Sequence, residues 1–516
     1  MITTADEVSP PDSHRPDRDN EPVPTTTADP AGTRKQLADL RPDLLTGYDT
    51  ALPAAHAAIL ARLLLALEHE PLPGLLTRHH HDGRTHLRFT HTTVTYPTTA
   101  ATPFTEPPAG LTVAVDGTDV TDPAALTAHL WPAAALAAEI ANSVANLALA
   151  RAANPTPQAL PDPTEPGHLE QLLVDGHPLH PCCRTRGGMT VADLLAYAPE
   201  HHPTFPLRRL RVPQNRWYGT AYPILYAHPW QAAHLLDRHP WLTDDGPTTP
   251  VRPLMSLRTV APIDGGPHIK TAVDIQMTSA IRTVSPAAVH NGPRLSTFLD
   301  TLTADLPLDV LTETEAGAAI TDHGPDRHLA HLIRQAPPPG AIPLGVLATT
   351  PAILDTIDDP YTFITDLGTV LFAPLATLLD RGVALEAHGQ NTLILLSGGR
   401  PTRTIYRDLG GVRVHTTAGA PDLHGDLPTD DPAELRTKLA AAALATVARQ
   451  TITALSRHHH AEPDKLWRLL ATALRHADPK LRTDPLPVKA TTAMRLAADP
   501  LHDQWTHLPN PMAAFA

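Results

Sequence analysis

Cysteine is almost absent from this chain of 516 residues. Only two are present, adjacent to each other at Cys182 and Cys183. A neighbouring pair cannot form a disulfide framework, and it supplies too few ligands for a structural zinc site. We therefore expect neither a disulfide-stabilised nor a zinc-stabilised fold, and the cysteine usage indicates a reducing compartment, the cytoplasm.

Long uninterrupted apolar runs are also missing. No basic segment followed by an apolar stretch opens the chain, as it would in a secretory leader. The most apolar segments contain polar residues; residues 130–150, for example, include Glu139 and Asn142. Such segments are typical of packed amphipathic helices rather than membrane spans. We expect no membrane partner.

Segregated positive charge is the third absence. The formal net charge is −14, and acidic and basic residues are interspersed. This distribution argues against nucleic acid as the main partner and favours small-molecule ligands. The 31 histidines accompany many Ala, Pro, Thr, Arg and Asp residues, so their number indicates a compositional bias. For the histidine tracts 79–81 and 458–460, a solvated surface is favoured over the alternative, a metal site.

The length of the chain predicts roughly two to four domains. Residues 1–36 are rich in Pro, Thr, Asp and Glu and poor in large apolar residues, so we expect this segment to be disordered. The proline-rich residues 154–166 predict a linker. A mixed region of helices and strands follows as far as about residue 380. The class expected for the whole chain is α+β.

Hydrophobic periodicity predicts the individual elements. Helical spacing occurs in residues 37–45, 54–67 and 124–151, and strand-like alternation in residues 85–96. Residues 371–380 favour a helix. Residues 382–415 predict strands with a turn at Gly410-Gly411, and helices are expected at residues 432–456, 462–477 and 488–498.

A segment with two His-Pro pairs is the first functional candidate. His177-Pro178 and His180-Pro181 lie just before Arg184, Arg186 and a glycine pair. Each proline fixes its own φ and biases the preceding residue toward extended backbone, so both imidazoles are held on a stiff chain. Ordinary core packing does not require this pattern. The segment predicts a cationic cradle for an anion.

Further polar residues follow at strand spacing. In residues 269–278, Lys270 and Thr278 share one face of the expected strand, and Arg282 comes four residues later. Ser256 and Arg258 are two residues apart and share a face as well. A half-exposed sheet with solvated polar positions is the alternative for any one strand. Several such strands together favour a nucleotide site.

Residues 385–391 combine a carboxylate, an imidazole and two amides around one glycine. Glu386, His388 and Asn391 precede an apolar strand, and Arg407-Asp408 follows it. An amide and a carboxylate on adjacent segments suit Mg²⁺, which prefers oxygen ligands shared with a nucleotide. A structural turn with capped side chains is the alternative.

In this order the motifs resemble those of the IucA/IucC family of NRPS-independent siderophore synthetases, over about residues 166–500. The matching elements are His-Leu-Glu-Gln at 168–171, Gly-His-Pro-Leu-His-Pro at 176–181, His-Pro-Trp-Gln at 228–231, Ser-Leu-Arg-Thr at 256–259, the Lys270 strand with Thr278 to Arg282, Glu-Ala-His-Gly-Gln-Asn at 386–391, Arg407-Asp408, and residues 489–496. Each piece is short, but the combined set is specific.

The resemblance implies an ATP-dependent synthetase that adenylates a carboxylate, often of citrate, and passes the acyl group to an amine or hydroxyl. AMP and pyrophosphate are the other products. It also implies a cupped, hand-like architecture, with a thumb at residues 37–160, fingers at 161–380 and a palm at 381–516. A homodimer with ATP, Mg²⁺ and the polycarboxylic acid in a central cleft is expected.

The resemblance also implies roles for individual residues. The expected ATP-binding residues are His177, His180, Arg184, Ser256, Arg258, Thr259, Lys270, Gln390, Asn391 and Asp408. The expected metal ligands are Glu386, Asn391 and Asp408, and the expected acid-binding residues are Thr278, Arg282 and His388. Among these, His388, Arg282 and Lys270 are the expected catalytic residues, with His388 either a base or a hydrogen-bond donor.

One position departs from the family pattern. A lysine commonly follows the second His-Pro by three residues, and here Arg184 occupies that place. The charge is kept, but a planar guanidinium changes the geometry at a phosphate. This departure leaves open the hypothesis of a family member that binds nucleotide without catalysis. The pairing of Asn391 and Asp408 also suits γ-phosphoryl transfer, so a phosphotransferase stays open as a third hypothesis. No nucleophile is assigned to Cys182 or Cys183, because the expected intermediate is a mixed anhydride.

Overall fold

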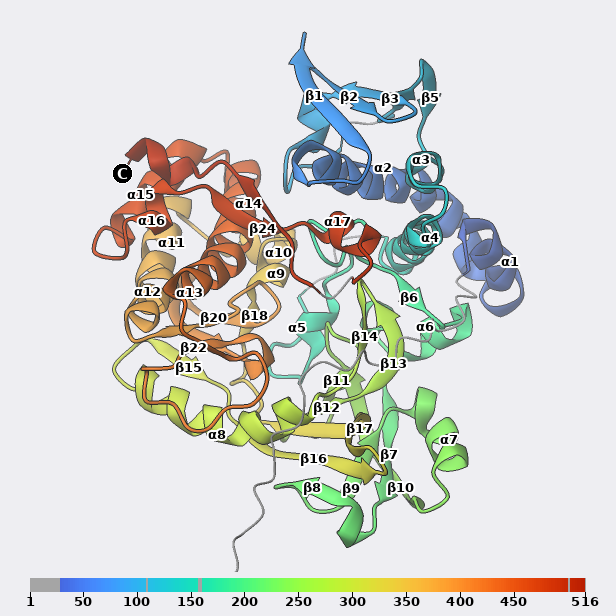
Figure 1. Ribbon diagram of the computed structural model, residues 1–516, viewed down its shortest axis with the longest axis vertical. Helices are drawn as coiled ribbons and strands as arrows, with labels where there is room; N and C mark the ends of the chain where they lie inside the picture. Colours follow the sequence, from blue (N-terminus) through green and yellow to red (C-terminus); the bar gives the residue numbers. More distant parts are fainter. Residues whose placement is uncertain (1–27, 108–109, 156–159, 500–501, 516) are drawn as a thin grey trace, which may run out of the picture.

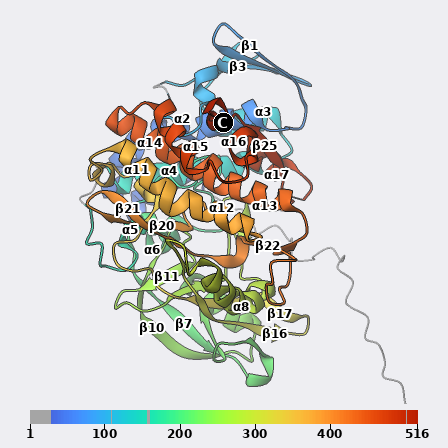
Figure 2. The same ribbon diagram turned by 90° about the vertical axis from the view of Figure 1, so that its left-hand side faces the viewer.

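The computed structural model describes residues 28–107, 110–155, 160–499 and 502–515 (Figure 1). The chain forms three masses, coloured blue, green to yellow, and orange to red in Figure 1. Figure 2 shows a small N-terminal sheet at one end of the molecule and a large sheet at the other, with C-terminal helices between them. Both helices and sheets are prominent, which confirms the α+β class.

The N-terminal mass packs long helices against a sheet. Its helices are α1 (Pro30–Leu40), α2 (Leu45–His69), α3 (Pro123–Leu130) and α4 (Leu136–Ala153). Its antiparallel sheet has the order β1 (Leu75–His81), β2 (Arg84–Phe89), β3 (Thr93–Pro97), β4 (Val113–Val115) and β5 (Thr118–Val120). The core between them is apolar, with Leu60, Leu64, Val144 and Leu147 fully buried.

Two expectations for this part were wrong. Residues 1–27 lie outside the described residues, but the rest of the segment expected to be disordered enters helix α1 at Pro30. Asp29 caps that helix by accepting a hydrogen bond from the Gly32 amide at 2.7 Å, and Leu37 is buried. The single helix expected at 124–151 is two helices, because Pro132 cannot continue α3 and forces Trp131 out of helical geometry.

The green to yellow mass is built on the large sheet, which is antiparallel throughout its described pairs. Its order is β8 (Trp217–Gly219), β16 (Glu313–Thr321), β17 (Gly324–Arg334), β12 (His268–Thr271), β11 (Thr259–Pro262), β10 (Thr243–Pro253), β7 (Phe205–Arg211) and β9 (Ile224–Ala227). Helix α7 (Pro229–Arg238) packs beside it. A smaller sheet, β14 (Ala280–Arg282), β13 (Val273–Met277) and β6 (Arg186–Gly187), joins it to the N-terminal mass.

The strand expected at residues 269–278 is interrupted. Lys270 belongs to β12 of the large sheet, whereas β13 begins at Val273 in the smaller sheet. Thr278 lies in the turn after β13 with φ of 60°. The regular alternation that put Lys270 and Thr278 on one strand face was therefore wrong, because the chain changes sheets at Ala272.

The third mass, which is orange to red in Figure 1 except for the yellow to yellow-green α8 (Pro286–Thr303) and β15 (Leu308–Val310), has a mixed sheet covered by helices. The sheet order is β15, β21 (Arg400–Tyr406), β20 (Thr392–Ser397) and β18 (Ile342–Pro343). The major helices are α8, α11 (Pro360–Leu367), α12 (Ala373–Asp380), α13 (Pro432–Leu439), α14 (Arg449–His459) and α15 (Pro463–Ala473). π-Helical turns at Gly368–Phe372 and Ala440–Ala448 connect α11 to α12 and α13 to α14.

Short elements complete the described chain. They are α5 (His168–Gln171), α6 (Val191–Tyr197), α9 (Leu344–Leu347), α10 (Pro351–Leu354), α16 (Lys480–Thr483), α17 (Thr491–Leu496), β19 (Val383–Ala384), β22 (Arg413–His415), β23 (Pro428–Thr429), β24 (Leu486–Lys489) and β25 (Trp505–Leu508). The Gly-Gly turn expected at 410–411 is a short 3₁₀ helix, Leu409–Gly411. The helix expected at 488–498 begins later, after strand β24.

The C-terminal core begins well before residue 381. Leu295, Leu347, Phe363 and Leu378 pack in one buried cluster with residues of α14 and α15. The boundary that we expected at residue 380 falls inside this core. We propose instead that the structural division lies near the start of α8, with β16 and β17 returning to the large sheet.

Three helical stretches among the described residues are long and apolar enough to cross a membrane, judged by length and composition. They are Pro42–His69, Pro360–Asp380 and Pro432–His459, and 44%, 61% and 61% of their most apolar windows are buried inside the protein. The apolar side chains of these stretches supply much of the N-terminal and C-terminal cores. Their composition is thus accounted for in large part by core packing.

Candidate active site

A buried ion pair lies where the large sheet meets the C-terminal mass. Lys270 on β12 donates from Nζ to Asp408 Oδ1 at 2.7 Å, and the lysine is only 8% exposed. Burial lowers the pKa of Lys270, partly offset by Asp408. Burial would raise the pKa of Asp408, but Lys270, Arg334 and Arg258 together outweigh it and hold that pKa well below its usual range. The surrounding cations thus favour the charged form of Asp408.

The Ser256 to Thr259 turn adjoins this pair. Thr259 is the direct cross-strand neighbour of Lys270, and the Thr259 amide donates to Ser256 Oγ at 3.2 Å. Leu257 takes a φ of 63°, which tightens the turn, and Arg258 donates to the Thr283 carbonyl. Burial, reinforced by the charge of Arg282, lowers the pKa of Arg258 to about 10. The expected ATP-binding residues of this turn are thus brought beside Lys270.

Two further buried charges were missed by sequence reasoning. Glu313 and Arg334 face each other across β16 and β17, and each is almost fully buried. Burial raises the pKa of Glu313, with Lys270 opposing, and its Oε1 accepts from the Leu409 amide at 3.2 Å. The Nε of Arg334 is buried and has no hydrogen-bond partner among the described residues. A charged residue at the end of an otherwise apolar strand was the available signal. We call Arg258, Lys270, Glu313, Arg334 and Asp408 the charged cluster.

Three histidines form the other side of the site. The Nδ1 atoms of His177, His180 and His388 each accept a backbone amide hydrogen bond two residues on, at 3.3, 2.9 and 3.3 Å. A neutral ring that accepts at Nδ1 carries its proton on Nε2, so each ring offers an N–H donor there. His180 Nε2 contacts Ser279 Oγ at 2.5 Å. We call these three residues the imidazole cluster.

Desolvation by the surrounding protein lowers the pKa of each ring in the imidazole cluster, although only His180 is fully buried and His177 is exposed. The charges of His388 and of nearby cations add to the effect on His177. The direction of these pKa shifts disfavours a positive charge on the histidines of the expected cationic cradle. They are neutral donors, suited to bind an oxyanion through directed hydrogen bonds.

Arg282 lies between the two clusters. Its Nη2 donates to the Met277 carbonyl at 3.0 Å and to Thr278 Oγ1 at 3.1 Å. Its charge acts on Arg258 in the charged cluster and on His177 in the imidazole cluster. Arg282 is thus fixed at one edge of its guanidinium by the turn that also holds Thr278. The expected acid-binding pair is brought together.

The segments that carry the expected metal ligands are joined by hydrogen bonds to their backbones. The Asn391 amide nitrogen donates to the Glu386 carbonyl at 3.4 Å, and the Tyr406 hydroxyl accepts from the Glu386 amide and donates to the Asp408 carbonyl. Tyr406 therefore joins the backbones of both segments. Lys438, another residue missed by sequence reasoning, donates to Glu386 Oε1 at 3.2 Å.

A buried bidentate pair locks this arrangement. Arg407 donates to both carboxylate oxygens of Glu170 and to the Gln390 carbonyl at 2.9 and 3.1 Å. Glu170 Oε2 in turn accepts from the Met255 amide at 3.3 Å. The pair ties α5, the turn before Ser256 and the 386–391 segment together. Both residues lie in motifs that carried the resemblance, but no role was assigned to them.

Arg184 lies outside both clusters. Its guanidinium donates to Glu200 Oε2 at 3.0 Å, to the Val174 carbonyl at 2.7 Å and to the Leu173 carbonyl, and the residue is 3% exposed. All three of its nitrogens are engaged in these contacts. Of the expected ATP-binding residues, it is the one whose charged group is committed to internal structure.

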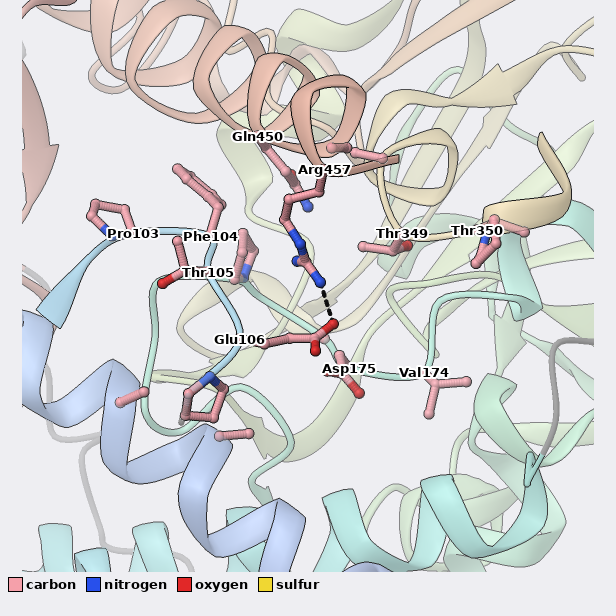
Figure 3. A pocket seen from close by; sticks show the side chains of 18 of the residues that line it. Pro103, Phe104, Thr105, Glu106, Val174, Asp175, Thr349, Thr350, Gln450 and Arg457 are labelled. Carbon is pink, nitrogen blue, oxygen red and sulfur yellow. Dashed lines mark hydrogen bonds and ion pairs between the residues drawn. The ribbon is translucent and has the colours of Figure 1, made fainter. Parts of the chain in front are cut away.

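A pocket of about 660 Å³ is lined in part by the 172–178 segment (Figure 3). Gly176 and Pro178, which flank His177, contribute to its wall, and the rest comes mainly from α2, the 102–107 loop, residues 348–354 and α14. Arg457 on α14 reaches across it to Glu106 (Figure 3). None of the residues that the sequence predicted for the active site lines this pocket.

Comparisons with known proteins agree with the motif order. Residues 167–222 and 218–354 match the model of the IucA / IucC family, and residues 364–513 match that of the ferric iron reductase FhuF-like transporter. Staphyloferrin A synthase of Staphylococcus aureus is 29% identical over 48% of this chain and 53% of its own length. L-2,3-diaminopropanoate–citrate ligase of the same organism is 26% identical over 48% of this chain and 54% of its own length.

The fold has a solved counterpart. The ATP-bound structure of aerobactin synthetase IucA from Klebsiella pneumoniae superposes with a TM-score of 0.70, covering 89% of this chain and 99% of that one at 18% identity. The chain spans about half the length of the curated relatives it matches in sequence. Residues 167–354 therefore match the IucA / IucC family, and the chain shares the fold of the aerobactin synthetase.

Proposed function

We propose that this protein is an ATP-dependent synthetase that activates a carboxylate of citrate, or of a related polycarboxylic acid, as an acyl-adenylate. The activated acid is then condensed with an amine or hydroxyl group in the biosynthesis of a siderophore or a related natural product. The observation that carries the proposal is the convergence of Arg258, Lys270 and Arg282 beside Asp408, from segments far apart in sequence. Similarity to citrate ligases and to an ATP-bound synthetase supports it.

The first half-reaction joins two anions. A carboxylate oxygen attacks the α-phosphorus of ATP, and the bond to the β-phosphate breaks to release pyrophosphate. Lys270, Arg258 and the unpartnered Nε of Arg334 are placed to offset the charge on the phosphate oxygens. Arg282 is placed to hold the acid with the edge of its guanidinium that Thr278 does not occupy.

The donor set also fits Mg²⁺. Asp408, Asn391 and Glu386 offer carboxylate and amide oxygens, and the second oxygen of Asp408 is not used by Lys270. A bound Mg²⁺ would neutralise phosphate charge and orient the triphosphate. We propose these three residues as its protein ligands.

In the second half-reaction, the acceptor nitrogen or oxygen attacks the acyl carbon, the bond to AMP breaks, and the proton of the acceptor passes to solvent water. His388 already accepts a hydrogen bond at Nδ1 and carries its proton on Nε2. We therefore assign it the role of hydrogen-bond donor to the acid rather than that of base, which narrows the two roles expected from sequence.

Product analysis tests this function. Purified protein is incubated with ATP, Mg²⁺, hydroxylamine and one acid at a time, including citrate and 2-oxoglutarate. The proposal predicts AMP and pyrophosphate in equal amounts, together with a hydroxamate. Formation of ADP would instead support the phosphotransferase hypothesis, and ATP binding without turnover on any acid would support the non-catalytic one.

Two observations bear on the alternatives. The departure at Arg184 motivated the non-catalytic hypothesis, but that side chain is committed to Glu200 and two carbonyls. A redox function based on an iron–sulfur cluster would need cysteine ligands, and residues 364–513 contain none. We further propose a cytoplasmic homodimer without a membrane or nucleic-acid partner, which light scattering of the purified protein would test.

A further inference from the structure

Two histidines and one aspartate meet at the edge of α8, outside the candidate active site. His290 lies in the first half of α8, and Asp422 and His424 lie in the connection between β22 and β23. One ligand atom of each residue falls within 4.8 Å of the others. The Asp422 Oδ2 atom is 3.5 Å from His424 Nε2 and 3.9 Å from His290 Nε2.

The two imidazole rings are stacked face to face. Their centroids are 3.6 Å apart and their planes differ by 6°. Two imidazolium rings at this separation would repel strongly, so at least one ring is neutral and has a lone pair. The Nε2 atom of His290 is buried and has no hydrogen-bond partner of normal geometry among the described residues, while Nδ1 of the same ring contacts the Tyr218 hydroxyl at 3.3 Å.

The position of His424 is fixed by a buried clamp. Asn291, next to His290, accepts from the His424 amide and donates to the His424 carbonyl, both at 2.8 Å. Asn291 is only 2% exposed. Gly425 follows with φ of 76° and passes close to Ala287 on α8. The connection is therefore held against the helix at the point where the three side chains meet.

We propose that His290, Asp422 and His424 bind a divalent transition-metal ion of the Zn²⁺ type, which clips the 416–427 connection to α8. In a tetrahedral site with bonds of about 2.1 Å, ligand atoms lie about 3.4 Å apart, close to the observed nitrogen–oxygen separations. The two ring planes are parallel, so the His424 ring has to turn out of the stack for both Nε2 atoms to face one ion, and its half-exposed position permits that turn. Two imidazoles and one carboxylate favour such an ion over Mg²⁺ or Ca²⁺, and they leave one position for water.

This site differs in chemistry from the proposed Mg²⁺ site. Glu386, Asn391 and Asp408 offer only oxygen atoms, whereas this trio offers two nitrogens. Excess Mg²⁺ should therefore leave Zn²⁺ in place here. Because binding is measured directly, the result does not depend on whether the protein is a synthetase.

The test is calorimetric titration of the chelator-treated full-length protein with Zn²⁺ in the presence of excess Mg²⁺. We expect one tight equivalent in the wild type, at least tenfold weaker binding in His424→Ala, and a smaller loss in Asp422→Asn. His323→Ala, at an exposed turn between β16 and β17, is the matched control and should bind as the wild type does. Other histidines of this chain can bind Zn²⁺ weakly. The proposal is therefore tested by the difference in Zn²⁺ affinity between His424→Ala and His323→Ala.

A second readout uses Co²⁺ in place of Zn²⁺. We expect visible absorption bands of a nitrogen- and oxygen-ligated ion that weaken in His424→Ala and persist in His323→Ala. His424 is half exposed, so its replacement should leave the fold intact. Equal affinity of the wild type and His424→Ala for Zn²⁺, or absence of a tight equivalent in the wild type, would overturn the proposal.

Discussion

In the charged cluster, the pKa of Asp408 is lowered in favour of its charged form, whereas in the imidazole cluster the pKa values of His177 and His388 are lowered in favour of the neutral ring. The difference between the two clusters comes from the groups that contact each side chain. Lys270 and Asp408 form an ion pair at 2.7 Å, which compensates for lost hydration. The histidines have neutral backbone donors at Nδ1 and cations nearby, and both disfavour a second proton.

The comparison teaches that one site recognises anions in two ways. The charged cluster can offset phosphate charge, and the imidazole cluster can direct hydrogen bonds without adding charge. Arg282, between them, can do both. Substitutions in the charged cluster and in the imidazole cluster should therefore change different properties of the protein.

Lys270→Ala should have the largest effect. It removes the cation and leaves Asp408 buried without its partner, and we expect acid-dependent pyrophosphate release to fall by about 10²–10³. Lys480→Ala, on exposed α16, is the control and should retain full activity. If the activity of Lys270→Ala stayed within threefold of the wild type, the ion pair would not be required for catalysis.

Arg282→Ala should act on the acid rather than on ATP. Loss of a bidentate partner for a carboxylate should lower kcat/KM for the acid by about 10², with a much smaller change in KM for ATP. Arg282→Lys should recover little, because an ammonium cannot present two parallel donors. Steady-state kinetics with each substrate varied in turn makes the measurement. Equal changes in the kinetic constants for the acid and for ATP would contradict a specific role of Arg282 in binding the acid.

Arg184→Lys should affect stability rather than nucleotide binding. Lysine keeps the charge near Glu200 but loses donors to buried carbonyls, so the free energy of unfolding should fall by about 1.5–3 kcal/mol. KM for ATP should not change. Urea denaturation and ATP kinetics on the same preparation check both statements. A raised KM for ATP with an unchanged free energy of unfolding would indicate that Arg184 binds ATP after all.

His177→Gln should change the pH dependence of stability. The pKa of His177 is lowered to about 3 in the folded protein, so between pH 6.5 and about 3 the unfolded chain binds the extra proton. The stability from the neutral ring is complete above pH 6.5 and is lost as the pH falls. In the variant, the free energy of unfolding should fall less steeply over this interval, and the difference should be small because His177 is exposed to solvent. Identical slopes, measured by urea denaturation from pH 7 to 5, would contradict a neutral ring at His177.

The motifs indicated which distant residues lie close together better than periodicity predicted the fold. Lys270, Arg258 and Asp408 lie in separate short motifs whose order indicated the family, and the structure brings them together. Periodicity did not show that the chain changes sheets at Ala272, because β12 and β13 are both apolar on one face. Nor did it find the helix that Asp29 caps within a polar, proline-rich segment.

The property that was least predictable from the sequence was which group each buried charged side chain contacts. A buried Arg looks the same in sequence whether it faces a ligand or an internal carboxylate, and Arg184 pairs with Glu200 only because the 172–176 segment folds back over it. Likewise, Glu170 and Arg407 are 237 positions apart, and only the folded chain shows that they form one pair. Such contacts depend on tertiary structure, which spacing along the chain does not encode.

Acid-dependent exchange of labelled pyrophosphate into ATP tests the central claim most directly, because it measures reversible adenylation of the acid without any acceptor. The account predicts exchange in the wild type only when a suitable polycarboxylic acid is present, and loss of exchange in both Lys270→Ala and Arg282→Ala. Exchange that needs no acid, or that survives both substitutions, would contradict it.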